Sequence, residues 1–304
     1  MVSWRVANTV AAIAAAQALG DLEVDPRRTP IQIAPAISQC ELPLIWRPLP
    51  RLFGVYLDNP GQDRGILVNN GLTRAVRRHT AAHELGHHRL GHETTLDFGL
   101  DADPVHDRAD DPRQSSKEKA AEAFAAWFLM PRRGVLTTMR ELGLPRITAA
   151  AQVYQLALHL GTSYAATVRH LATLRLISAT EERAWSKIAP ATFKRAMTGD
   201  LLDTTRDVDT WHLGRGHRRV LYTSPGDLLI VPAPQEITRI EGAVNPIEQT
   251  PAGAAVLRCG TPDEDSDPAR IYTASGAITV VVEPRPYGLD RSGIAFAAQT
   301  ESTQ

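Results

Sequence analysis

The stretch Arg78-His79-Thr80-Ala81-Ala82-His83-Glu84-Leu85-Gly86-His87 decides the fold, because it contains the pattern HExxH. Helix signals lie on both sides of it: Thr73 is a good N-cap residue, and Gly91 is a typical helix stop. Side chains four positions apart on a helix diverge by only about 40°. We therefore expect a helix between Thr73 and Gly91 on which His83 and His87 can reach one metal ion.

Glu84 follows His83 directly and points about 100° away from it around the helix axis. A carboxylate in that position can contact a water molecule on the metal without being a ligand itself. Zinc lowers the pKa of its bound water to about 7, and the carboxylate can take up the proton and deliver it to the leaving amine. The pattern predicts a hydrolase with Glu84 as catalytic base. The competing interpretation is a pair of surface histidines beside a solvated glutamate.

Further histidines flank the motif, and spacing argues against His92 as the third ligand. The pattern HExxHxxGxxH needs its third histidine ten residues after the first, whereas His92 follows His83 by nine. In a continuous helix His92 would point about 180° from His83, although a helix end at Gly91 leaves this ligand open. His88 is expected on the surface, and His79 can line the site.

A catalytic zinc needs a third protein ligand and an open position. The next predicted helix, from Ser115 to Met130, carries Glu118 and Glu122 on one face. Spacing alone gives Glu118 two interpretations, since Ser115-x-x-Glu118 is a capping box and the same carboxylate can bind the metal. The segment Glu93 to Gln114 is expected to be an exposed loop. It holds weaker ligand candidates, which are Asp97, Asp101, Asp103 and His106.

The HExxH helix and the segment AEAFAAWFLMP, from Ala121 to Pro131, together resemble the ImmA/IrrE-type metallopeptidases. That family pairs HExxH with a downstream helix of the form E-x-x-x-N/E-x-F-A-A-x-x-L-M-P, and the resemblance covers about Pro30 to Pro131. It implies a gluzincin-like fold in which the downstream helix supplies a glutamate ligand, and this ligand falls on Glu118. Glu122 falls where many members carry Asn, which leaves its role open; it can orient a ligand.

The resemblance also implies an activity. Family members of this type cleave helix-turn-helix transcriptional repressors after DNA damage or during induction of mobile elements. The expectation is a zinc-dependent endopeptidase acting on a protein substrate, with one Zn²⁺ per chain and Mn²⁺ as the alternative metal. The competing class is a regulatory DNA- or protein-binding module that keeps a metal site for structure.

Substrate binding is predicted along the strand Gly65 to Asn70, which could pair with an extended peptide at a sheet edge. No side chain stands out as the group that stabilises the oxyanion. Arg78, His79 and His92 are the candidates.

Composition divides the chain into three predicted domains of an overall α+β protein. Residues 1–131 form the small zincin-like metallopeptidase domain, including a hairpin of Leu52–Leu57 and Gly65–Asn70. Residues 132–200 are helical. Residues 203–304 are predicted to form an all-β sandwich for sensing or interaction. Its clearest strands are Val220 to Tyr222, Asp227 to Val231, Ala255 to Arg258 and Ile278 to Val282.

The helical middle contains a helix–glycine turn–helix cadence from Val153 to Leu171, which resembles a helix-turn-helix. The predicted recognition helix offers only Arg169, His170 and Arg175 as cations, and phosphate binding usually needs several on one face. We favour a substrate-docking or structural module over a DNA reader.

Charge and composition argue against several classes of protein and of binding partner. The 33 basic and 34 acidic side chains give a net charge of -1, so no global argument favours nucleic acid or an acidic membrane. At 43% hydrophobic residues the chain can bury a sizeable core. Cys40 and Cys259 form no disulfide framework, which fits a cytoplasmic location.

The N-terminal segment Met1 to Gly20 has a weak likeness to a secretory signal. Polar residues interrupt it, and Val6, Val10 and Ile13 follow helical spacing. We expect an amphipathic helix that ends at Gly20. No run of about eighteen apolar residues exists, so no transmembrane helix is predicted.

Overall fold

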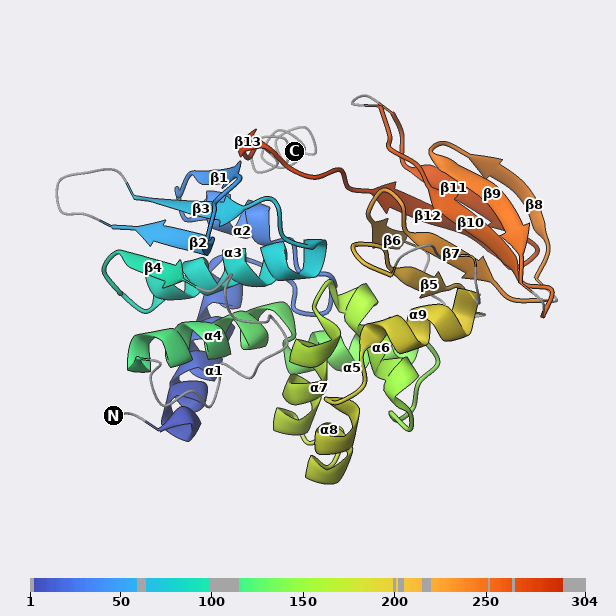
Figure 1. The fold of residues 1–304 in the computed structure, drawn as a ribbon. Helices are drawn as coiled ribbons and strands as arrows, with labels where there is room; N and C mark the ends of the chain where they lie inside the picture. The colour runs from blue at the N-terminus through green and yellow to red at the C-terminus, as the bar shows by residue number, and fades with distance from the viewer. Residues whose placement is uncertain are drawn as a thin grey trace. The chain divides into compact units, whose positions relative to one another are not determined.

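The protein is described by a computed structural model that divides into two compact units (Figure 1). Unit 1 comprises Met1–Val135, Leu160–Thr162 and Pro286–Gln304, and unit 2 comprises Leu136–His159 and Ser163–Arg285. The described residues are 3–58, 64–98 (95–98 as backbone only), 115–198, 201, 205–214, 220–233, 235–250, 252–263 and 266–291. The predicted division into three domains stays a prediction.

Unit 1 is built on a five-stranded sheet with the strand order β13-β1-β3-β2-β4. Its strands are β1 (Leu44–Arg47), β2 (Leu52–Leu57), β3 (Gly65–Asn69), β4 (Thr95–Phe98) and β13 (Gly288–Leu289). β2 and β3 pair antiparallel, which confirms the predicted hairpin, while β3 runs parallel to β1. The hairpin's turn lies outside the described residues.

Two predictions about this sheet are wrong. β3 has strands on both sides, so its backbone groups are already paired and it cannot take up a peptide at an edge. The segment after the HExxH helix is not all loop, because 95–98 forms β4, which pairs antiparallel with β2. β4 and β13 are the edges of this sheet within the described part of the chain.

The helices of unit 1 form layers on the sheet. They are α1 (Trp4–Asp21), α2 (Ile33–Gln39), α3 (Arg74–Arg89) and α4 (Ser116–Leu129). α3 packs against β2 and β3, α4 packs against α3, and α1 packs against α4 (Figure 1). α3 confirms the helix predicted between Thr73 and Gly91, with Thr73 as its N-cap.

α1 is a helix, but its buried face differs from the predicted one. The residues on which the amphipathic pattern depends, Val6, Val10 and Ile13, are 52%, 50% and 58% exposed. Apart from Leu19, the buried face is made of alanines, whose small side chains allow close approach to α4. These are Ala7, Ala11, Ala15 and Ala18. The helix also continues past Gly20 to Asp21.

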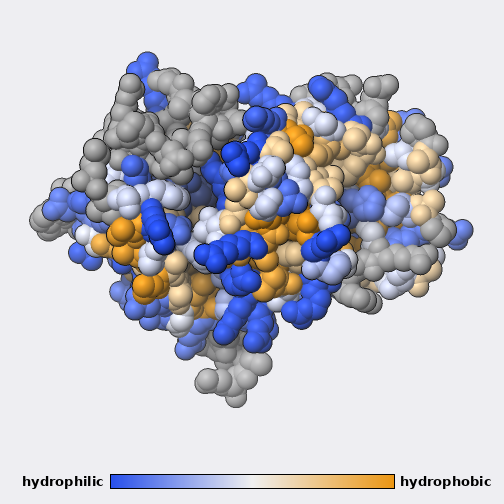
Figure 2. All heavy atoms as spheres, turned by 90° about the horizontal axis from the view of Figure 1, so that it is seen from below, coloured by the Kyte–Doolittle hydropathy of each residue, from blue (hydrophilic) through white to orange (hydrophobic). Residues whose placement is uncertain are grey.

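The face of the molecule drawn in Figure 2 carries hydrophobic side chains in separate patches between hydrophilic ones. Among the helices that the structure describes, none has both the length and the apolar character needed to cross a membrane.

Unit 2 contains helices followed by strands. The helices are α6 (Ala150–Leu160), α7 (Tyr164–Thr173), α8 (Ala179–Trp185) and α9 (Pro190–Thr198), and α5 (Arg132–Glu141) leads into them from unit 1. α6 and α7 are joined by a turn with Gly161 at φ +67°, as the sequence cadence predicts. His170 is buried, at 4% exposure, so it is not available on the surface of α7.

The C-terminal part of unit 2 forms two four-stranded sheets, with the orders β5-β7-β10-β9 and β6-β12-β11-β8. Each contains one parallel pair, β5 with β7 and β6 with β12. The bounds are β5 (Thr210–His212), β6 (Val220–Thr223), β7 (Leu228–Val231), β8 (Ile237–Glu241), β9 (Val244–Gln249), β10 (Ala255–Cys259), β11 (Ala269–Thr273) and β12 (Gly276–Val282). The four strands predicted in this region and the α+β class are confirmed.

Candidate metal centre

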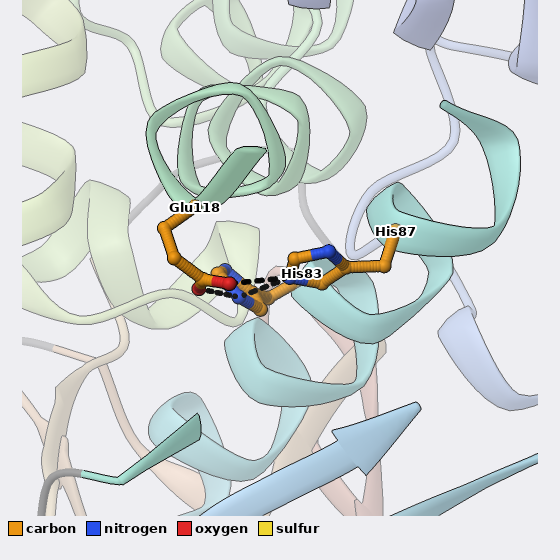
Figure 3. Close-up of side chains that lie close together, drawn as sticks. All are labelled: His83, His87 and Glu118. Atoms are coloured by element: carbon orange, nitrogen blue, oxygen red, sulfur yellow. Dashed lines mark hydrogen bonds and ion pairs between the residues drawn. The ribbon is translucent and has the colours of Figure 1, made fainter. Parts of the chain in front are cut away.

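His83 and His87 on α3 and Glu118 on α4 point toward one another (Figure 3). The Nε2 atoms of the two histidines lie 3.0 Å apart. Glu118 places Oε2 at 3.1 Å from Nε2 of His83 and Oε1 at 3.5 Å from Nε2 of His87. The structure therefore brings together the three residues predicted as ligands, with ligand atoms all within 4.8 Å of one another.

The donor set and its spacing fit a zinc ion. A tetrahedral zinc with bonds of about 2.0–2.1 Å holds its ligand atoms about 3.4 Å apart. The observed separations of 3.0 to 3.5 Å bracket that value. Two imidazole nitrogens and one carboxylate are also the ligands that zinc takes in hydrolases, with a fourth position left for water. That these residues bind a metal stays a prediction.

Close packing of α3 on α4 positions the glutamate. A Cβ atom on Gly86, inside the HExxH motif, would lie 3.0 Å from Cδ1 of Phe124 on α4. The missing side chain thus lets the phenyl ring rest on the α3 backbone. This contact lies six residues along α4 from Glu118, and we expect it to influence how near that carboxylate comes to the two histidines.

Both interpretations of Glu118 apply at once. Its backbone N–H donates to Oγ of Ser115, the N-cap of α4, at 3.2 Å. Its carboxylate points instead to the histidines. Burial raises the pKa of the Glu118 carboxyl, but hydrogen bonds and charge attraction from His83 and His87 outweigh it and hold the pKa well below its usual range. Glu118 is therefore an anion, as a ligand must be.

Glu84 is fully buried between α3 and β2. A Cβ atom on Gly54 in β2 would lie 2.8 Å from Oε1 of Glu84 and 2.6 Å from Cγ2 of Thr80. Gly54 therefore makes room for the carboxylate, and sequence reasoning missed it. The available signal was a glycine in the middle of a strand, which often marks a close approach.

His92 contacts a predicted ligand rather than the metal position. The chain reverses at Gly91, with φ +67°, and the N–H of His92 donates to the carbonyl oxygen of His87 at 2.9 Å. This is a Schellman turn. It brings the Nδ1 atoms of His87 and His92 to 2.9 Å, so the continuous-helix argument for His92 does not apply.

The hydrogen bond between these rings orients His87. Burial, followed by the charge of His87, lowers the pKa of His92 to about 4, so His92 is neutral at pH 7. The Nδ1 atom of a neutral His92 can accept a hydrogen bond from Nδ1–H of His87. The Nε2 lone pair of His87 then faces the site, which is the tautomer that a metal ligand needs.

Glu122 occupies the corresponding place near the other histidine. Its Oε2 lies 2.8 Å from Nε2 of His79 and 3.7 Å from Nδ1 of His83. Burial raises its pKa, but the charges and hydrogen bonds of His79 and His83 outweigh burial and hold the pKa well below its usual range. Glu122 is thus an anion that ties His79 to the ligand side of the site.

The remaining candidates have other partners. Arg78 is buried and donates to the backbone carbonyls of Ile31 and Gly161, which removes it from the site. His88 is not a surface residue as predicted but half-buried, with Nδ1 at 3.0 Å from the hydroxyl of Tyr56 on β2. The weaker ligand candidates fall outside the described residues or side chains. They are Asp97, Asp101, Asp103 and His106.

Residues 52–171 match a known family model, Peptidase_M78, described as the IrrE N-terminal-like domain. The match begins in β2 and ends in α7, so it contains the HExxH helix, Glu118 and the segment that follows it. A search of curated proteins finds no match. The paired motifs, the clustered side chains and the family match therefore agree with one another over residues 52–171, where the chain is similar to the IrrE N-terminal-like domain.

Proposed function

We propose that the protein is a zinc-dependent endopeptidase in which His83, His87 and Glu118 hold the metal and Glu84 is the general base. The observation that carries the proposal is the convergence of these three side chains at 3.0 to 3.5 Å beside a buried glutamate. Manganese is the alternative metal, since the same ligands accept it.

A bound zinc ion would supply Lewis-acid polarisation of the scissile carbonyl and lower the pKa of water at the site. The chain's own residues transfer the proton and hold the reacting groups in position. Glu84 takes a proton from the attacking water and gives it to the departing amine nitrogen. Gly54 confines the Glu84 carboxylate on its β2 side, and His92 holds the ring of His87 in place.

We place the substrate on the outer edge of β4. β4 is the edge strand next to β2, and β2 borders Glu84 through Gly54. An extended peptide that pairs with a strand edge is bound through its backbone and needs no free terminus. This mode favours internal cleavage of a protein over removal of terminal residues.

For the substrate we propose a helix-turn-helix transcriptional repressor, whose cleavage would act in a stress or mobile-element response. The support for this choice is the resemblance of the paired motifs to the ImmA/IrrE type.

The test compares purified wild-type protein with Glu84→Gln and Glu118→Ala. Elemental analysis measures zinc, and mass spectrometry identifies new N-termini in candidate repressors and in total protein from the source cells. The expected result is about one zinc per chain in wild type and Glu84→Gln, less in Glu118→Ala, and new N-termini with wild type alone. No zinc in reconstituted wild-type protein would overturn the proposal.

The alternative is a DNA- or protein-binding module with a structural metal. Under it, Glu84→Gln would leave metal, fold and partner binding unchanged, and no N-termini would appear. Burial of His170 weakens the DNA-binding version, because it leaves Arg169 on α7 and Arg175, which lies past the end of α7, as the remaining predicted contacts.

A further inference from the structure

Unit 2 contains a cleft of about 390 Å³ between its helices and its strands. We name it the α6–α9 cleft. α6, α9 and the loop after α5 form one side, and β5, β6 and β12 contribute the other, with all lining residues in unit 2. The metal centre lies in unit 1, so this is a separate site.

Hydrogen bonds fix the walls of the cleft. Gln155 on α6 binds the backbone of β5 twice, donating to the carbonyl of Thr210 at 2.9 Å and accepting from the N–H of His212 at 2.8 Å. The hydroxyl of Tyr154 accepts from the N–H of Thr210 at 3.0 Å and donates to Asp209 at 3.1 Å. α6 and β5 are therefore held together by protein contacts alone, as the walls of a preformed pocket are.

The lining selects against charged ligands. Apolar residues make up most of it, among them the half-buried Leu142, Phe193 and Met197, and none of the lining residues in the described part of the chain is Asp, Glu, Lys or Arg. Its polar members include His159 and His212. Burial lowers the pKa of His212, so this imidazole is neutral at pH 7. Against these lining residues a charged molecule would lose its hydration without gaining an opposite charge.

We propose that the α6–α9 cleft binds a neutral, largely apolar small molecule with a hydrogen-bonding group that reaches the imidazoles. The size follows from comparison with a cavity of about 150 Å³, which holds one benzene ring. A volume of 390 Å³ accommodates two or three fused or linked rings, or an acyl chain of similar bulk. This site is independent of the proposed peptidase activity.

The test uses two fluorescent probes with the same ring system on the full chain. N-phenyl-1-naphthylamine is neutral, and 8-anilino-1-naphthalenesulfonate adds one negative charge. The proposal predicts saturable, one-to-one binding of the neutral probe, at least about tenfold tighter than the anionic probe. No saturable binding of the neutral probe, or equal affinity for both, would overturn it.

Blocking variants locate the probe. Ala151 on α6 and Ala196 on α9 line the cleft and are exposed, so Ala151→Phe and Ala196→Phe should fold while filling its space. Each substitution should weaken binding of the neutral probe at least about tenfold. Thr192→Phe, exposed on α9 outside the lining, is the control and should bind as wild type does. Circular dichroism confirms folding, and undiminished binding by both blocked variants would refute the site.

Discussion

Gly54 on β2 and Glu84 on α3 are packed so closely that a methyl group on Gly54 would lie 2.8 Å from Oε1 of Glu84. Such a distance is shorter than real Cβ contacts, so either the strand or the carboxylate would have to move. The same methyl group would meet Cγ2 of Thr80 at 2.6 Å. The position of the proposed general base thus depends on an absent side chain in the sheet.

Gly54→Ala should therefore separate catalysis from metal binding. We expect peptidase activity to fall by about 10²-fold or more, because general-base catalysis depends on the carboxylate's position. Zinc content should stay at the wild-type level, and overpacking should cost about 1–3 kcal/mol of stability. Gly20→Ala, where the added Cβ meets nothing within 4 Å, is the matched control. Wild-type turnover by Gly54→Ala would contradict this account.

Gly86→Ala tests the helix contact that places Glu118. The new Cβ would approach Cδ1 of Phe124 at 3.0 Å and push α4 away from α3. We expect weaker zinc binding, by about tenfold, measured by competition with a chelator. Phe124→Leu in the same chain should recover part of the loss, because it removes the ring. A double variant no better than Gly86→Ala would refute the link between helix spacing and metal affinity.

The features that the sequence predicts correctly depend on near neighbours. The N-cap at Thr73, the stop at Gly91 and the spacing of His83 and His87 all act within one helix. Glu118 was left between two interpretations, because its cap is local whereas its contact with α3 depends on packing. Only the family resemblance favoured the ligand.

The errors concern long-range pairing. From the sequence alone β3 was expected to be an edge strand, because no local signal gives the order of strands in a sheet. In the structure β1 lies beside it. β13 pairs with β1 although the two strands are at opposite ends of the chain. α1 was assigned the wrong buried face, since Val6 is more apolar than Ala7 but too large for the close contact with α4. Gly54 was missed because its close contact with Thr80 and Glu84 on α3 is also a contact between distant segments of the chain.

His92→Gln should weaken zinc binding while the ligands stay intact. The imidazole of His92 lies 2.9 Å from Nδ1 of His87, and losing such a partner typically costs 10–100-fold in metal affinity. The readout is the zinc dissociation constant from chelator competition. This constant would not change if His92 only stabilised the fold. His88→Gln, four positions earlier and bonded to Tyr56, is the control and should bind zinc normally. Equal zinc affinity in both variants would exclude the positioning role.

Asp227 should make the stability of unit 2 depend on pH. Burial, with the nearby charge of Asp209, raises its pKa to about 7, although the backbone N–H groups of Asp209 and Ser224 and the indole N–H of Trp211 partly oppose the shift. In the unfolded chain an aspartate titrates near pH 4. The folded state therefore holds the proton more tightly. The resulting stabilisation is complete below about pH 4 and is lost as the pH rises through about 7.

The measurement is hydrogen exchange of peptides covering 205–214 and 220–233, corrected for intrinsic rates, between pH 5 and 8. Opening free energies should fall by about 3 kcal/mol between pH 5 and pH 8, since each pKa unit is worth about 1.4 kcal/mol and about two units of the shift lie in this range. Asp227→Asn should lower protection at pH 5 and flatten the pH dependence, because an NH₂ group in place of either oxygen leaves at least one of the three N–H donors without its acceptor. An unchanged slope in Asp227→Asn would show that another group carries the effect.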